Sequence, residues 1–216
     1  MQKKIFFGVA IILISLFFIT LSVVKQSFKI SVTPTELPLI QSGTIELPVS
    51  EYDSFYGNPG SPVTIDEFFS FDCKECNDLH EQLIAYADSH QGKVRLRSTG
   101  ILKINWFGQQ KDSLPLLSLA CAEQQEKYWP FLNKILKLSK FNEEISKSLI
   151  QELKLDEAGF NKCLLDETIQ NKVQNKQTVL QSSGFSKTPL VFINNKQINL
   201  TEGVKIAEIL NGVIAE

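Results

Sequence analysis

A Cys-x-x-Cys pair lies between an apolar run and a helical pattern, and its position constrains the fold more than any other feature of this sequence. Cys73 and Cys76 directly follow the strand-like residues 63–71. A strand that delivers Cys73 to a helix N-terminus leaves its sulfur facing unpaired backbone N–H groups and the positive end of the helix dipole, which both favour the thiolate. Cys76 lies one turn further on, within disulfide reach and deeper, as suits a resolving cysteine. The pattern therefore predicts a redox centre.

The residues around this pair predict a strand, a helix and a second strand. Residues 63–71 are almost continuously apolar, with β-branched and aromatic side chains, which is typical of a central strand buried on both faces. The helix after Cys73 carries one apolar stripe, and residues 93–98 then alternate as in a strand. Residues 114–165 have helical periods only, with Asp156 placed as an N-cap.

The C-terminal part predicts a hairpin and a last helix. A further helix is expected to run to about residue 183 and to end at Gly184. The apolar runs 190–193 and 197–200 flank an Asn-Asn-Lys turn, and Thr201 is expected to cap the last helix. The resulting order is β-α-β, a helical block, then β-β-α. This order predicts an α/β fold of the thioredoxin type with a helical insertion subdomain.

Several segments resemble the thioredoxin superfamily, and within it the DsbA-like thiol:disulfide oxidoreductases of the bacterial cell envelope. Residues 57–68 resemble the family's approach to its first core strand. Residues 121–129 (CAEQQEKYW) resemble its helical insertion, and residues 184–194, which contain Thr188-Pro189, resemble its cis-proline loop and the following strand. The resemblance runs from about Gly57 to the C-terminus. It implies thiol:disulfide oxidoreductase activity centred on Cys73 and Cys76.

The resemblance also implies roles for three other residues. Glu67 lies in the apolar strand, where a buried carboxylate is costly. The matching acid of the family lies beneath the disulfide and relays a proton to or from the deeper cysteine. Pro189 matches a catalytic cis-proline beside the disulfide, and Thr188 matches the residue whose backbone pairs with an extended substrate peptide. The residues alone leave two alternatives open, a solvent-reaching Glu67 at a strand end and a trans turn at Pro189.

The remaining cysteines, Cys121 and Cys163, fall in the helical block. In an oxidising compartment they are predicted to form a structural disulfide, and some relatives carry such a second bridge. The alternative is two inert buried thiols. A zinc site would need a second cysteine pair at similar spacing, and His80 and His90 are the only histidines, so no metal or other cofactor is predicted. Both histidines are predicted to be solvated.

The dipeptide between the redox cysteines bears on the direction of electron transfer. Strongly oxidising members of the family have Pro-His there, and the histidine helps to hold the thiolate. This chain has Lys74-Glu75. The negative charge of Glu75 is expected to destabilise the Cys73 thiolate, partly offset by Lys74, which gives a weaker oxidant. Thr188 is shared with isomerase-like relatives as well as with oxidases. We favour an oxidase, with reductase and isomerase as the other directions.

The N-terminus predicts a membrane anchor. Residues 5–24 form a twenty-residue apolar run behind Lys3 and Lys4, long enough to span a bilayer and without a small-x-small cleavage site. We expect an uncleaved anchor over residues 1–26 and a linker over residues 27–56, rich in Ser, Thr and Pro as far as residue 53. The alternative is that its apolar residues between Leu37 and Val49 pack on the domain as an extra strand.

These features set the expected domains and place the catalytic domain outside the cytoplasm. It is predicted to span residues 57–216, with the helical insertion at about 112–180. The protein is expected in the bacterial inner membrane, with a single span and the domain facing the periplasm or cell exterior, because disulfide chemistry suits an oxidising compartment.

Composition excludes several partners. The formal net charge is −2 and charged residues make up 21%, so nothing indicates nucleic-acid binding. The expected partners are exported proteins that contain cysteines and a membrane or envelope redox partner, and a monomer is expected. Two other functions stay open: a non-catalytic binding module braced by disulfides, and a maturation factor for one envelope metalloprotein.

Overall fold

The computed structural model describes residues 47, 54–103, 113–198, 200 and 206–214. In this part of the chain it has five strands and seven helices. The predicted anchor over residues 1–26 and nearly all of the predicted linker lie outside the described residues. Among the helices that are described, none has the length and hydropathy needed to cross a bilayer.

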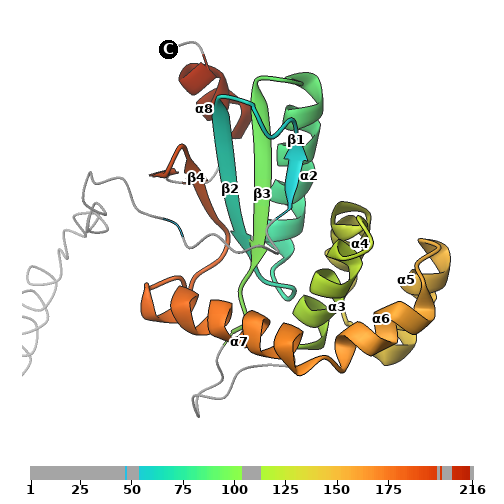
Figure 1. Cartoon of the computed structure of the whole chain (residues 1–216). Helices are drawn as coiled ribbons and strands as arrows, with labels where there is room; N and C mark the ends of the chain where they lie inside the picture. Colours follow the sequence, from blue (N-terminus) through green and yellow to red (C-terminus); the bar gives the residue numbers. More distant parts are fainter. Residues whose placement is uncertain (1–46, 48–53, 104–112, 199, 201–205, 215–216) are drawn as a thin grey trace, which may run out of the picture. The chain divides into compact units, whose positions relative to one another are not determined.

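The five strands form one mixed sheet in the order β1-β3-β2-β4-β5 (Figure 1). The strands are β1 (Phe55–Gly57), β2 (Val63–Phe69), β3 (Val94–Gly100), β4 (Leu190–Ile193) and β5 (Lys196–Ile198). The central strand β2 runs parallel to β3, with Glu67 opposite Ser98, and antiparallel to β4. The other two pairings are also antiparallel. The strand, helix, strand unit predicted from the sequence is confirmed.

Strand β1 was not predicted. It begins at Phe55, inside the segment assigned to the linker, and pairs with β3 at the edge of the sheet. Its three residues are too few to show an alternating pattern, so tertiary contacts decide its conformation. The guanidinium of Arg95 lies 4.5 Å from the centre of the Phe55 ring and helps to hold the strand in place.

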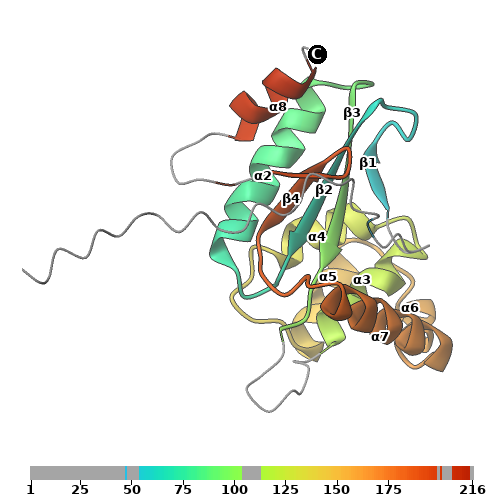
Figure 2. The same ribbon diagram turned by 90° about the vertical axis from the view of Figure 1, so that its left-hand side faces the viewer.

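Helices α2 (Lys74–Ser89) and α8 (Ile206–Ile214) lie side by side on one face of the sheet (Figure 2). The Tyr86 hydroxyl of α2 donates a hydrogen bond of 2.8 Å to Asn211 Oδ1 of α8. The predicted apolar stripe of α2 is buried, and the chain turns after the helix at Gly92, whose φ of +78° suits glycine. The predicted cap Thr201 lies outside the described residues.

Five helices between β3 and β4 form the helical block. They are α3 (Leu114–Glu123), α4 (Tyr128–Ile135), α5 (Glu143–Glu152), α6 (Glu157–Leu164) and α7 (Glu167–Ser182). The predicted N-cap Asp156 is confirmed, because its side chain accepts from the Ala158 N–H. Figure 1 shows that the block lies at the end of the sheet from which α2 starts. The Cys-x-x-Cys motif therefore lies where the two parts of the fold meet.

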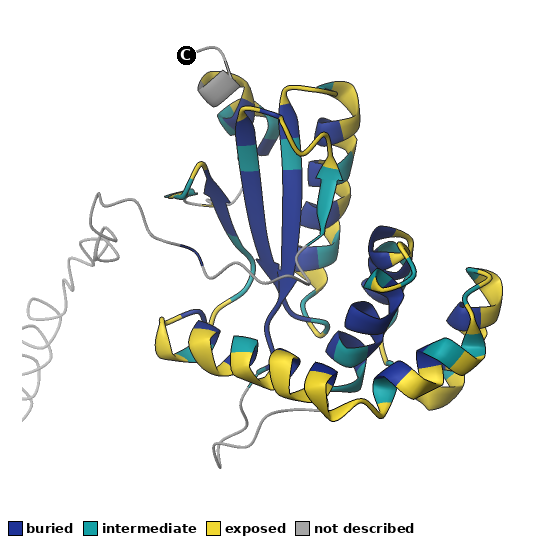
Figure 3. Ribbon diagram, in the orientation of Figure 1, coloured by how far each residue is buried: buried dark blue, intermediate teal, exposed yellow. Residues whose placement is uncertain are grey.

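The central strands β2 and β3 are buried on both faces, as predicted for β2 (Figure 3). Ile65 and Phe69 belong to the larger core beneath α2. Phe68, which points to the opposite face, packs in a second cluster with Phe185, Phe192 and three aliphatic residues. One of these is Leu47, which is 4% exposed. At least this residue of the predicted linker thus packs on the domain.

The predicted hairpin is present with a tighter turn. Asn194 and Asn195 have φ values of +48° and +65°, as a two-residue type I′ turn requires. Lys196, predicted as part of the turn, already pairs with Ile193. The Asn194 side chain also accepts a hydrogen bond of 2.9 Å from the Thr64 N–H, which ties the turn to β2.

Candidate active site

The redox cysteines are joined at the start of α2. Cys73 is the N-cap residue, with extended backbone angles, and its Sγ accepts a hydrogen bond of 3.1 Å from the Cys76 N–H. The two sulfurs form a disulfide, with an S–S distance of 2.00 Å. Cys73 is half-buried, whereas Cys76 is fully buried in the core. An incoming thiolate can therefore approach Cys73 and not Cys76.

The Thr188–Pro189 peptide bond is cis, and the loop that contains it contacts Ser70, three residues before Cys73. The hydroxyls of Thr188 and Ser70 are 2.9 Å apart, and the Cys73 N–H donates to the Ser70 carbonyl at 3.2 Å. Ser70 thus connects the proline loop to the redox cysteine. Thr188 and Pro189 are half-buried. The predicted pairing of Thr188 with a substrate peptide stays a prediction.

Glu67 is completely buried in β2, on the face that packs beneath α2. Its Oε2 atom accepts hydrogen bonds from the Ser98 hydroxyl at 2.5 Å and from His80 Nδ1 at 2.7 Å. The alternative of a solvent-reaching acid at a strand end is therefore excluded. Proton transfer by Glu67 stays a prediction, which is based on the family resemblance.

The prediction that His80 is solvated is wrong, because only 2% of the residue is exposed. Cys76, His80, Leu83 and Ala87 follow the spacing of a single helix face and are all buried. This spacing could have identified the histidine. The ring also contacts Asn133 of α4, with Nε2 2.8 Å from Oδ1, and no sequence pattern indicated that residue.

The surroundings of His80 favour its charged form. Burial lowers the pKa of the imidazole, but hydrogen bonds with Glu67 and Asn133 and the negative charges of Glu67 and Glu81 outweigh it and raise the pKa above its usual range. His90, at the end of the same helix, is half-buried and stacks on Tyr86, with ring centres 4.0 Å apart.

Charged groups surround the exposed side of the motif. Lys74 and Glu75 are both exposed, and Glu75 lies in the first turn of α2. Asp72 and Lys103 form an ion pair of 2.9 Å in which both side chains remain partly exposed. The predicted effect of Glu75 on the Cys73 thiolate stays a prediction.

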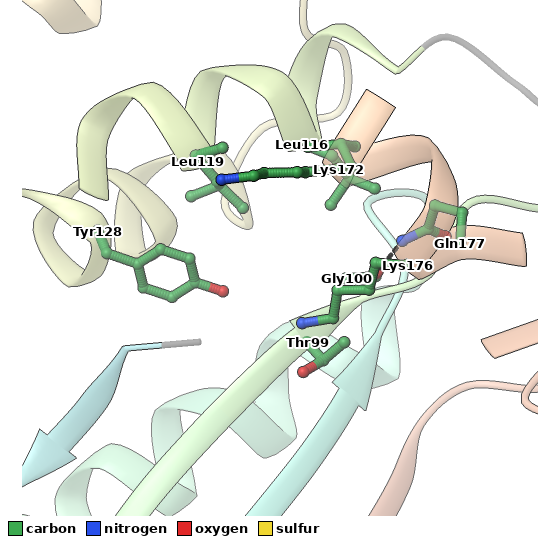
Figure 4. A pocket seen from close by; sticks show the side chains of 10 residues that line it. Thr99, Gly100, Leu116, Leu119, Tyr128, Lys172, Lys176 and Gln177 are labelled. Atoms are coloured by element: carbon green, nitrogen blue, oxygen red, sulfur yellow. Dashed lines mark hydrogen bonds between the residues drawn. The ribbon is translucent and has the colours of Figure 1, made fainter. Parts of the chain in front are cut away.

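Two hollows lie near this end of the sheet. One, of about 300 Å³, adjoins the motif at Phe71 and Asp72 and continues between Ile101 and Leu138. The other is lined by residues of β3, α3, α4 and α7 (Figure 4). None of its lining residues belongs to the Cys-x-x-Cys motif or the proline loop, so it is not part of the redox site.

Cys121 of α3 and Cys163 of α6 form a second disulfide, with an S–S distance of 2.04 Å. Both residues are buried inside the helical block. No group of three or more His, Cys, Asp or Glu residues in the described part of the chain is arranged to hold a metal ion.

The fold and this site define the chain as a protein of the thioredoxin class. A thioredoxin family model matches residues 49–211, and the chain belongs to that family. No protein among curated sequences matches it.

Several solved structures share this fold. Oxidised BdbD from Bacillus subtilis is 18% identical, with a TM-score of 0.63 over 78% of this chain and 96% of that one. Alpha-DsbA1 from Wolbachia pipientis is 21% identical, with a TM-score of 0.60 over 79% and 92%. A thioredoxin-like oxidoreductase from Silicibacter pomeroyi DSS-3 is 20% identical, with a TM-score of 0.61 over 76% and 91%. At these identities the likeness shows the fold alone.

Proposed function

We propose that this protein catalyses thiol–disulfide exchange in exported proteins, with oxidation of substrate dithiols as its favoured direction. One observation carries the proposal: a half-buried Cys73 at a helix N-terminus is bonded to a fully buried Cys76, beside a cis-proline loop. This arrangement leaves one sulfur open to another polypeptide and keeps the other ready to resolve the intermediate.

In the oxidising direction, a substrate thiolate attacks Cys73 Sγ. A substrate–Cys73 bond forms, the Cys73–Cys76 bond breaks, and Cys76 leaves as a thiolate that takes up a proton. The second thiolate of the same substrate then attacks the substrate sulfur of the mixed disulfide. The substrate disulfide forms, the bond from that sulfur to Cys73 breaks, and Cys73 leaves as a thiolate. The substrate loses two electrons and the Cys73–Cys76 pair gains them. An envelope redox partner is proposed to reoxidise the pair.

We also propose that the protein works outside the cytoplasm, held by the apolar segment at residues 5–24. Two disulfides in one small domain support this location, because disulfides persist in oxidising compartments. The proposal would fail if the full-length protein, expressed in bacteria, were recovered from the soluble cytoplasmic fraction with reduced cysteines.

The activity is tested with purified protein and two variants. Cys73→Ser should abolish both oxidation of a dithiol peptide and reduction of insulin, whereas Cys76→Ser should accumulate mixed disulfides that survive non-reducing electrophoresis. Substantial activity in Cys73→Ser would refute the catalytic assignment. Lack of mixed disulfides in Cys76→Ser would favour the disulfide-braced binding module instead.

The direction is tested by equilibrating Cys73 and Cys76 with glutathione buffers. A reduction potential towards that of DsbA, about −120 mV, supports an oxidase, and one near that of thioredoxin, about −270 mV, indicates a reductant. The Cys121→Ala, Cys163→Ala double variant is the matched control, because it leaves only the pair that is being measured.

A further inference from the structure

His80 lies between two oxygen atoms inside the fold. Its Nδ1 atom is 2.7 Å from Glu67 Oε2, and its Nε2 atom is 2.8 Å from Asn133 Oδ1. With the Asn133 carbonyl oxygen turned toward Nε2 and Glu67 ionised, both partners are acceptors, so each ring nitrogen carries a proton in this arrangement. The geometry therefore favours an imidazolium cation next to the buried carboxylate, in agreement with the raised pKa of His80.

One oxygen of Glu67 is available for a further proton. Oε2 accepts from Ser98 and His80, whereas Oε1 is buried and has no hydrogen-bond partner among the described residues. A buried carboxylate oxygen without a partner is costly, unless a proton or another donor reaches it.

Cys76 lies on the same face of α2 as His80, one turn nearer the helix start. Side chains four residues apart on a helix have Cβ atoms about 6 Å apart. Cys76 is thus the neighbour of His80 on the buried face of α2, and His80 in turn contacts Glu67.

Few other charged groups face His80 and Glu67. On α2 the nearest is Glu81, which is exposed and forms an ion pair of 2.9 Å with Lys137, beyond the end of α4. From β3 the pair meets the neutral hydroxyl of Ser98. From α4, besides the neutral amide of Asn133, the Trp129 ring stacks on the His80 ring, with centres 6.0 Å apart. The charge on His80 is therefore balanced mainly by Glu67.

We propose that His80 is the positioning residue for the buried acid of the redox site. As an imidazolium it keeps Glu67 ionised and aligned, so that the carboxylate can exchange a proton with Cys76. This inference rests on the proposed function and deepens it, since it assigns the pH dependence of the exchange to a histidine outside the Cys-x-x-Cys motif.

The proton transfer is balanced as follows when the protein acts as a reductant. In the mixed disulfide, the Cys76 thiol gives its proton to Glu67 and its sulfur attacks Cys73 Sγ. The Cys73–Cys76 bond forms, the bond from Cys73 to the substrate breaks, and the substrate leaves as a thiolate with the electron pair. Once Glu67 is neutral, it no longer stabilises the positive charge of His80. His80 then releases a proton to water and takes up the proton from Glu67, which restores the ion pair. The oxidising direction reverses these steps.

The test compares His80→Gln with the full-length wild-type protein. Without the imidazolium, the Glu67 carboxylate would be a buried charge with no opposite charge beside it, and burial disfavours the ionised form that the proton transfer needs. The attack of Cys76 is measured by stopped flow on the mixed disulfide between Cys73 and a fluorescent peptide. The measured quantity is the rate of peptide release, which does not depend on protein concentration. We expect about a tenfold slower release at pH 6 and a difference below about twofold at pH 9, where cysteine ionises without help.

Two controls separate this role from a structural one. His90→Gln removes the other histidine of α2 and should leave the pH profile of release unchanged. In a Glu67→Gln background, adding His80→Gln should change the profile no further, because His80 acts through Glu67. A loss in His80→Gln that is equal at all pH values, or one that persists unchanged in the Glu67→Gln background, would overturn the proposal.

Nitrogen-15 NMR of histidine provides a readout that is independent of activity. Both ring nitrogens of His80 should be protonated at pH 7 in the wild type, and at least one should lose its proton at that pH in Glu67→Gln. The His80 titration should also shift between the oxidised and reduced protein. A neutral His80 in the wild type overturns this inference and leaves the proposed function intact. If the NMR results hold and the protein lacks exchange activity, the proposed function fails while the pairing of His80 with Glu67 stands.

Discussion

The disulfide between Cys121 and Cys163 should be the largest single contributor to the stability of the helical block. It joins α3 to α6 across a separation of 42 residues. In the chain-entropy model, closing a loop of this length removes enough freedom from the unfolded state to stabilise the fold by about 4 kcal/mol. For a chain of this size, 1 kcal/mol corresponds to about 2–4 °C in Tm, so loss of the bridge should lower Tm by about 8–16 °C.

The bridge is best isolated in a Cys73→Ala, Cys76→Ala background. There a reductant breaks the Cys121–Cys163 bond alone and leaves both sulfurs in the core. Urea unfolding of the oxidised and reduced forms gives the two free energies of unfolding by linear extrapolation. The difference should be about 4 kcal/mol, out of the 5–15 kcal/mol typical of a domain.

Two results would refute this reasoning. A difference below about 1.5 kcal/mol would mean that the unfolded chain is already restrained or that the helical block does not need the bridge. A difference that appears only as a changed m-value would place the effect in the compactness of the unfolded state, rather than in loop closure.

Three further substitutions test the packing and the charges around the site. Gln177→Leu should cost about 2 kcal/mol or more in urea unfolding, because Gln177 bonds the Leu102 N–H and the Gly100 carbonyl, and a neutral effect would contradict this bridging role. Gly100→Ala should cost about 1–3 kcal/mol, since the new Cβ would lie 2.5 Å from Leu116 Cδ2, and an unchanged Tm would show that the side chain moves freely. The raised pKa of His80 means that the folded protein keeps a proton which the unfolded chain releases near pH 6.5. The stability that wild type gains over His80→Gln should therefore be complete below that pH and decline as pH rises through the folded pKa, and a gain that grows with pH would contradict the assignment.

Local patterns were sufficient for the order of the main elements. The apolar run of β2, the alternation in β3 and the Asn-Asn turn each depend on neighbours along the chain, and each was predicted correctly apart from small shifts at the ends. The N-cap at Asp156 was predicted for the same reason, since its hydrogen bond reaches only two residues along the chain. Strand β1 was missed because a three-residue edge strand exists only through its partner.

The sequence alone predicted the redox chemistry of the motif, because Cys73 and Cys76 are only three residues apart. A strand followed by a helix also leaves few possible positions for the two sulfur atoms. The environment of the motif required the fold. His80 is 13 residues from Glu67 and 53 from Asn133, and only the packing of α2 against β2 and α4 brings the three side chains into one hydrogen-bonded chain. The sheet and helices bury these side chains, and charges interact more strongly in such an interior than at the surface, which is the physical basis of the role proposed for His80.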